Sequence, residues 1–178
     1  MPKPNRLVDL FHHRWTVPLL GELHRTAGAK MVALVHRLGV NRGALRQTLD
    51  AAIRRGWVMR NPGYGHPLRP EFILTKSGAR IAGDCLELVK LMRSRKLERV
   101  ILRKWSAAVL HAVAAGRSRF SELKAALPGI SDRALALTLK QLHAAKLLRR
   151  HVRDAFPPAT EYVSVAAARP LVQILGRL

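Results

Sequence analysis

Any fold for this chain has to accommodate a repeat, because its first half resembles its second half at a nearly constant shift. Trp15 and Trp105 stand 90 residues apart, and each lies between a basic residue and a small hydroxyl residue. The same shift aligns further pairs: Leu20 with Leu110, Val40 with Ile130, Asn41 with Ser131, Leu45 with Leu135, Leu49 with Leu139, Arg60 with Arg150, Pro67 with Pro157, Glu71 with Glu161 and Phe72 with Tyr162. Matches at so many positions predict a tandem duplication.

Each copy carries the same order of local signals. Apolar residues recur at helical spacing over residues 15–25 and 30–38, and a third helix opens at Asn41, a favourable N-cap residue. Two strand-like runs, 57–60 and 71–75, flank a loop rich in Pro and Gly. The second copy has the same pattern: helices at 105–115 and 120–127, a third helix from Ser131, and strands at 147–150 and 161–165. Ser118 is the expected N-cap of the helix at 120–127. Gly28 and Gly116 are expected to close the first helix of the first and second copy, respectively. This order is that of a winged helix-turn-helix.

The expected fold class is therefore α+β, mainly α, with two tandem winged helix-turn-helix domains joined by a long basic helix. We expect a first domain at residues 1–83, a helical linker at 84–103 and a second domain at 104–178. The apolar spacing between the copies fits one long amphipathic helix or two abutting ones. Seven bases fall within residues 90–104, opposed only by Glu98. They form either the solvated face of a connector or a helix that contacts a nucleic-acid backbone.

The charge balance points to a polyanionic partner. The chain has 32 lysine and arginine residues against 11 acids, a formal net charge of +21, and 23 of the bases are arginine, whose planar fork suits phosphate. Nucleic acid is the favoured partner; a merely solvated basic surface, an acidic protein and a membrane surface are the alternatives. The sequence shows no secretory signal and no apolar run long enough to span a membrane, so a cytoplasmic, nucleoid-associated protein is expected.

Catalytic and metal chemistry find little support. The single cysteine, Cys85, excludes an internal disulfide and a cysteine-based zinc site. His12 and His13 are adjacent and point to different faces of a helix, and no histidine pair is spaced by four residues. No glycine-rich phosphate loop or catalytic triad order is present. The sequence therefore predicts neither an enzyme nor a cofactor or metal site.

The second copy resembles the HxlR-type winged-helix regulators, a group close to the MarR-like proteins. The residues that carry the resemblance are Lys104-Trp105, Arg119-Phe120, Leu123, Leu127 to Ser131, Leu135, Leu139, Leu142, Leu147 to Arg150, Pro157-Pro158 and Glu161-Tyr162. The first copy is similar through Trp15, Leu19-Leu20, Leu45, Leu49, Gly56 to Val58, Arg60, Glu71-Phe72 and Leu74 to Gly78. The resemblance implies a bacterial transcription regulator that binds double-stranded DNA. Family members work as homodimers, so two units on one chain imply an intramolecular pseudo-dimer, with further dimerisation left open.

The two copies differ in what their third helices offer to DNA. The first copy presents Arg42, Arg46, Gln47 and Arg54 opposite its leucine stripe, and Arg46 and Gln47 suit guanine and adenine edges. Asp50 either accepts from a cytosine amine or, as we favour, pairs with Arg46 or Arg54. The second copy presents Arg133, Lys140 and Gln141 but fills the family's polar positions with Ala136 and Leu137. The helix caps Asn41 and Ser131 and the wing residues His66, Arg69 and Arg153 complete the expected DNA-binding set.

These observations predict a sequence-specific, double-stranded DNA-binding transcription regulator. Ala136 or Leu137 would touch a thymine methyl group, or Leu137 would pack against a protein partner. Two further functions stay open: a nucleoid-type protein that coats DNA without sequence preference, and a winged-helix scaffold that binds an acidic protein or the transcription machinery.

Overall fold

The computed structural model describes residues 6–63, 69–153 and 159–178. Its contacts divide the chain into two compact units. The first comprises residues 13–94 with Leu178, and the second comprises residues 1–12 and 95–177. Each unit is helical with one small antiparallel sheet, so the expected mainly helical α+β class is confirmed.

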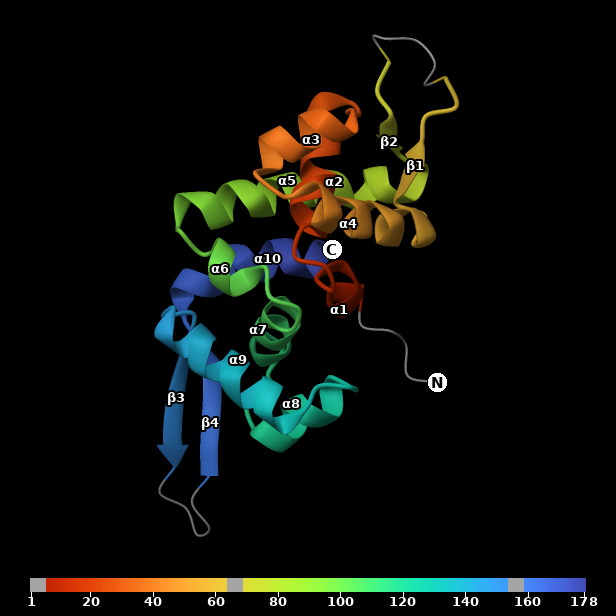
Figure 1. Cartoon of the computed structure of the whole chain (residues 1–178). Helices are drawn as coiled ribbons and strands as arrows, with labels where there is room; N and C mark the ends of the chain where they lie inside the picture. The colour runs from red at the N-terminus through yellow and green to blue at the C-terminus, as the bar shows by residue number, and fades with distance from the viewer. Residues whose placement is uncertain (1–5, 64–68, 154–158) are drawn as a thin grey trace. The chain divides into compact units, whose positions relative to one another are not determined.

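The described residues of the unit 13–94 form four helices and one hairpin, which Figure 1 labels. Its elements are α2 (Thr16–Thr26), α3 (Met31–Leu38), α4 (Arg42–Arg54), β1 (Val58–Arg60), β2 (Phe72–Leu74) and α5 (Lys76–Ser94). Leu20, Leu34 and Leu45 are fully buried between them. The helices α2 and α5 lie side by side, and a Cβ at Gly21 would come within 3.0 Å of the Leu86 Cα. Glycine at this point therefore permits the close approach of the two backbones.

The hairpin of this unit is joined to the helices by backbone hydrogen bonds. Strand β1 pairs with β2 so that Val58 lies opposite Leu74 and Arg60 opposite Phe72. Ala29, in the turn between α2 and α3, exchanges two hydrogen bonds of 3.0 Å with Phe72. Because Phe72 is itself buried, the hairpin is held against the helices at its base. The three-residue strands thus form one body with the helices.

Helix α5 begins at a packed turn directly after the hairpin. The Thr75 hydroxyl donates to the Gly56 carbonyl at 2.5 Å and accepts from the Gly78 N–H at 3.1 Å. Gly78 is buried, and a Cβ at this position would overlap the carbonyl oxygen of Trp57. The run Leu74 to Gly78 therefore serves a packing purpose: a hydroxyl closes the turn, and glycine lets the helix start against the strand.

The second unit has the elements α1 (Arg6–Leu10), α6 (Glu98–Ile101), α7 (Ser106–Ala114), α8 (Phe120–Ala126), α9 (Asp132–Ala144), β3 (Leu148–Arg153), β4 (Ala159–Ser164), the 3-10 turn η1 (Ala166–Ala168) and α10 (Arg169–Arg177). Helix α7 forms its centre, and Val109 and Leu110 are fully buried there. Helices α1, α8, α9 and α10 and strand β4 all contact α7. Within the hairpin Leu148 lies opposite Ser164 and Arg153 opposite Ala159.

Two of the sequence-based expectations about helix ends are wrong, and a third is confirmed. Ser118 does not cap α8; Arg119 takes the N-cap position, and the Glu122 carboxylate accepts the N–H groups of both Ser118 and Arg119, at 2.9 and 3.0 Å. These bonds, with Arg119 the stronger influence, hold the pKa of Glu122 below its ordinary value. Gly28 does not close α2 directly, because Ala27 first adopts the left-handed conformation at φ 51°. Gly116 closes α7 as predicted: it follows the C-cap Ala115 with a φ of 91°, and the N–H groups of Gly116 and Arg117 donate to the Val113 and Ala112 carbonyls at 3.0 and 3.1 Å.

The expected connector is not one continuous helix. Residues 84–103 comprise the second half of α5, a break at 95–97 and the short helix α6. Lys96 adopts a positive φ of 56°, which ends α5. Helix α5 also packs along α2 inside its own unit, with Ile81, Leu88 and Met92 buried. The apolar spacing allowed either one long helix or two abutting helices, and the structure has two. The sequence pattern predicted neither α1 nor α10.

Replacing Gly78 with alanine tests the close start of α5. The new Cβ would overlap the Trp57 carbonyl, so we expect a loss of about 1–3 kcal/mol in the free energy of unfolding, as for other overpacked sites. Gly83→Ala is the matched control on the same helix, because its Cβ meets His24 only at 3.7 Å. It should raise stability by about 0.5–1 kcal/mol. Urea denaturation followed by circular dichroism measures both, and equal midpoints for the two variants would contradict the packing argument.

Candidate nucleic-acid interface

Helix α4 buries one face and exposes a basic one. Leu45, Leu49 and Ala52 are at most 1% exposed, because they face α2, α3 and β1. The residues expected to contact DNA, Arg42, Arg46, Gln47 and Arg54, are all exposed on the remaining surface of the helix. The four side chains therefore share one accessible helix surface, as the sequence periodicity predicts.

The start of α4 is fixed by a side-chain cap. The Asn41 Oδ1 accepts a hydrogen bond of 2.8 Å from the Ala44 N–H, which confirms Asn41 as the N-cap. One turn further, the Thr48 hydroxyl donates to the Ala44 carbonyl at 2.8 Å. The cap satisfies one N–H and leaves the positive end of the helix dipole at the surface, beside Arg42. That end of the helix is suited to a phosphate group.

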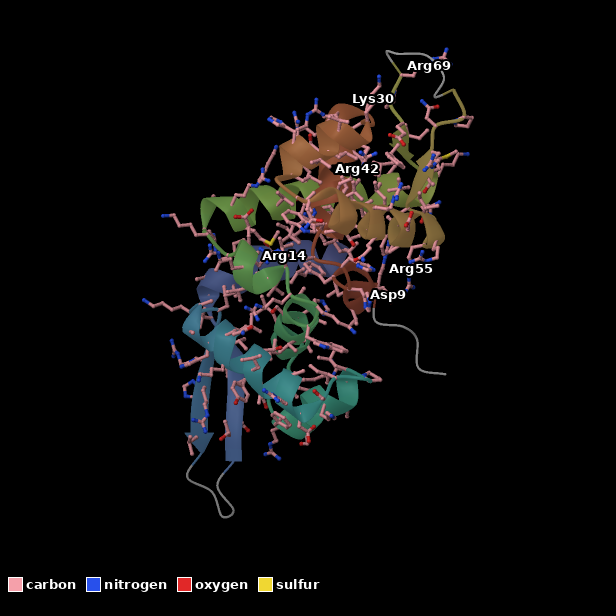
Figure 2. All side chains as sticks on the ribbon, viewed as in Figure 1. Asp9, Arg14, Lys30, Arg42, Arg55 and Arg69 are labelled. Atoms are coloured by element: carbon pink, nitrogen blue, oxygen red, sulfur yellow. The ribbon has the colours of Figure 1, made fainter. Side chains whose placement is uncertain are left out.

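A hollow of about 270 Å³ lies between α3, α4 and the hairpin. Its lining combines four basic residues, Lys30, Arg42, Arg46 and Arg60, with the acids Asp50 and Glu71 and with apolar side chains that include Leu49 and Phe72. Figure 2 shows the side chains of Lys30, Arg42 and Arg69 in this unit. The basic excess around the hollow gives this surface a field that attracts anions.

Two of the four basic residues that line the hollow, Lys30 and Arg60, have no binding role predicted from the sequence. Arg60 lies over the Phe72 ring at 5.7 Å, and Lys30 takes the N-cap position of α3. Both have basic counterparts in the second copy, Arg150 at a shift of 90 and Arg119 at a shift of 89. A basic residue at matching positions of both copies is the sequence signal that would have predicted a binding role for Lys30 and Arg60.

The favoured role of Asp50 is wrong. Within the part of the chain that the structure describes, its carboxylate forms no ion pair with Arg46 or Arg54, although both lie four residues away. All three side chains are exposed, and an exposed pair gains little over separate hydration. Asp50 instead lines the hollow beside Arg46.

The first wing is described only at its base. The Asn61 side chain accepts from the Gly63 N–H at 3.0 Å and donates to the Pro70 carbonyl at 3.0 Å. Arg69 is exposed and reaches the Gly63 carbonyl at 3.5 Å. His66 lies outside the described residues. The asparagine thus closes the loop at its base and brings Arg69 to the end of the hairpin.

Helix α9 has the same cap but a different outer face. The Ser131 Oγ accepts from the Ala134 N–H at 3.2 Å, so Ser131 is the N-cap as predicted. Arg133 and Lys140 are exposed, whereas Gln141 is half-buried. The Leu137 side chain is 49% exposed, which confirms that it lies outside the core. Arg153 ends strand β3, and its side chain lies outside the described residues.

The start of α9 is further held by Lys124 of α8. Its Nζ forms an ion pair with the Asp132 carboxylate at 2.7 Å and donates to the Ile130 carbonyl at 2.6 Å. Asp132 opens the helix, so its negative charge also lies at the favourable end of the helix dipole. Both side chains remain partly exposed, Lys124 at 42% and Asp132 at 77%, so the ion pair lies at the surface beside the first turn of α9.

Other kinds of site find no support in the described residues. They contain no group of three or more His, Cys, Asp or Glu side chains arranged to hold a metal ion. No described helix combines the length and the apolar character needed to cross a membrane. Cys85 is buried in α5.

Comparison with known proteins agrees with this geometry. Residues 100–178 match the HxlR-like helix-turn-helix family. The uncharacterized HTH-type transcriptional regulator YvaP of Bacillus subtilis is 33% identical over 86 residues, which cover 48% of this chain and 80% of YvaP. YkvN of the same organism, described in the same words, is 38% identical over 79 residues, 44% of this chain and 67% of YkvN. A relative in Methanothermobacter thermautotrophicus is 35% identical over 75 residues, and the match spans only 57% of its length.

A solved structure, a MarR-family transcriptional regulator from Porphyromonas gingivalis W83, covers 47% of this chain and 85% of its own, with 27% identity and a TM-score of 0.42. The helices and hairpin of residues 100–178, with the family match over the same residues, define a winged helix-turn-helix unit. The chain belongs to the HxlR-like helix-turn-helix family.

Removing the cap of α4 tests whether one side chain sets the start of this helix. Asn41→Ala leaves the Ala44 N–H without its partner, so the free energy of unfolding should fall by about 1 kcal/mol. Asn41→Ser is the control, since serine is an equally good cap and is the residue at the corresponding position of α9. Chemical denaturation measures both, and an unchanged midpoint for Asn41→Ala would mean that the helix start does not depend on this side chain.

Proposed function

We propose that this protein is a sequence-specific, double-stranded DNA-binding transcription regulator whose two winged-helix units act together as a pseudo-dimer. The observation that carries the proposal is the exposed basic face of α4, with its capped N-terminus at the surface. A recognition helix enters the major groove with its N-terminal residues first. Regulators related to this chain support the regulatory role, since they are described as HTH-type transcriptional regulators.

The proposal includes an origin by tandem duplication. Several local interactions recur at the 90-residue shift: the caps Asn41 and Ser131 each accept an N–H three residues on, and Thr48 and Thr138 each donate to the carbonyl four residues back. Both units also follow the order of three helices and a hairpin. In this proposal the duplicated sequence has a first domain at 1–83, a connector at 84–103 and a second domain at 104–178, whereas the compact units of the fold divide between residues 94 and 95.

Affinity in this proposal comes mainly from phosphate contacts. The net charge of +21 supplies a long-range attraction, and arginine, which makes up 23 of the 32 bases, can bind phosphate through two N–H groups at once. The proposed contacts to the DNA backbone come from the third helices and the wings: Arg42, Arg54, Arg133 and Lys140 on the helices, and His66, Arg69 and Arg153 on the wings. Asn41 and Ser131 would place helix N-termini against phosphates. DNA as the partner would place the protein on the nucleoid.

Specificity in this proposal comes mainly from α4. Arg46 offers two parallel N–H donors that match the O6 and N7 acceptors of guanine, and Gln47 matches the N6 and N7 pattern of adenine. Both are exposed on the second turn of the helix. The half-buried Gln141 is the base-reading amide proposed for α9.

Selection of bound sequences from a random duplex pool, with wild type and Arg46→Ala side by side, tests this proposal. We expect a defined motif for wild type and a blurred position for the variant, because a bidentate arginine contributes about 1–3 kcal/mol of discrimination at its base. Arg69→Ala is the control: it removes an exposed wing arginine and should weaken all sequences alike while preserving the motif. Equal loss on specific and random duplex for both variants would contradict this division of roles.

The salt dependence of binding tests the electrostatic part separately. The logarithm of the association constant should fall linearly with the logarithm of salt concentration, with a slope of about −0.9 for each phosphate neutralised. Arg69→Ala should reduce the magnitude of that slope by about one. Fluorescence anisotropy over a salt series measures it, and a slope near zero would contradict a phosphate-based interface.

A nucleoid-type protein that coats DNA is the second candidate, favoured by the charge of +21. It predicts the same salt dependence but no preferred sequence in the selection. A winged-helix scaffold for an acidic protein or the transcription machinery predicts no retained duplex at physiological salt. The selection experiment therefore separates all three functions.

A further inference from the structure

We propose that α9 recognises the 5-methyl group of thymine through Leu137 and Ala136. This inference rests on the proposed DNA-binding function and names what the second unit reads. Leu137 is 49% exposed, whereas Leu135, Leu139 and Leu142 of the same helix are at most 1% exposed. The core is therefore complete without Leu137, and this side chain places apolar surface in water on the outward face.

The position of the two residues suits base contact. Ala136 and Leu137 lie in the second turn of α9, and Ala136 is exposed as well. The residues near the N-terminus of a recognition helix are the ones that reach base edges in the major groove. The first turn is held by the Ser131 cap and by the Lys124 ion pair with Asp132. Leu137 and Ala136 therefore follow a helix start that is already held in place without DNA.

The surrounding charge selects DNA over a protein as the occupant. Arg133 lies four residues before Leu137 and Lys140 three residues after it, so both are its neighbours on the helix surface. Both are exposed, and neither is in an ion pair within the described residues. Two cations on either side of an apolar group match a groove whose walls are phosphates and whose floor carries a methyl group. Thymine is the one base of the four that presents a methyl group in the major groove.

The two third helices therefore read different chemical groups. At the shift of 90, Ala136 corresponds to Arg46 and Leu137 to Gln47. Where α4 offers hydrogen-bond donors to purines, α9 offers methyl and isobutyl groups. A composite site follows, with polar readout in the half bound by α4 and thymine readout in the half bound by α9.

Replacing thymine by deoxyuridine in the selected duplex tests the inference, because it removes the methyl group and keeps every hydrogen-bonding group. Each thymine is replaced singly, and binding is measured by anisotropy for wild type and for Leu137→Ala. We expect one or two replacements to weaken wild-type binding about fourfold each, the effect of burying one methyl-sized group. Leu137→Ala should no longer distinguish thymine from deoxyuridine at the base that Leu137 contacts, and Ala136→Gly should lose the distinction at the base that Ala136 contacts.

Two controls keep the result interpretable. Arg46→Ala must still distinguish thymine from deoxyuridine at the same positions, because it alters the other helix. Circular dichroism of Leu137→Ala must match wild type, as expected for a side chain outside the core. These controls assign the discrimination to the outer face of α9.

Three results would overturn the inference. Sequence-specific binding that is indifferent to every deoxyuridine replacement would leave the proposed function intact and remove thymine readout. Thymine discrimination that persists in Leu137→Ala and in Ala136→Gly would assign it to other residues. Self-association lost in Leu137→Glu, with DNA affinity kept, would make the Leu137 side chain a contact between copies. A selection without any motif would instead overturn the proposed function, and the inference with it.

Discussion

The hydrogen bond from the Ala44 N–H to the Asn41 side chain, repeated between Ala134 and Ser131, determines what each third helix can offer to a partner. The cap sets the residue at which the helix begins. Since the helical period then fixes every later direction, Leu45 and Leu135 must enter their cores, and Arg46 and Ala136 must face outward. Within each helix the period keeps the buried leucines and the outward residues on different faces, so core packing and the proposed base recognition depend on the same spacing.

Local chemistry made the order of elements predictable. The caps and the leucine spacing placed α4 and α9, and the strand-like runs on either side of a loop rich in Pro and Gly placed the first hairpin. Features that depend on distant residues were not predictable in this way. The Glu71 carboxylate accepts the Met31 N–H across 40 residues of sequence, and Ala29 pairs with Phe72. Neither contact has a local signal, although the pairing decides how the wing is attached.

The remaining differences between the predicted and the observed elements have other physical causes. Ser118 looks like a cap, but Arg119 takes the N-cap position, and the Glu122 carboxylate accepts the N–H groups of Ser118 and Arg119. Helix α1 has five residues, too few for a periodicity to emerge, yet Leu10 is fully buried. Among the candidate binding residues, exposure could be anticipated from the period. The partners of Asp50 could not be predicted, because an exposed carboxylate has nearly the same free energy in an ion pair as in water.

The different outer residues of α4 and α9 have a consequence for the geometry of a bound site. A homodimer of identical units looks the same after a half-turn about its axis, so its site is a palindrome and the complex has no direction along the DNA. A chain with Arg46 on one helix and Ala136 on the other lacks that equivalence. If one chain binds as the proposed pseudo-dimer, its site is asymmetric, and the protein sits on it in one orientation only. Such a complex distinguishes upstream from downstream, which a symmetric dimer does not do alone.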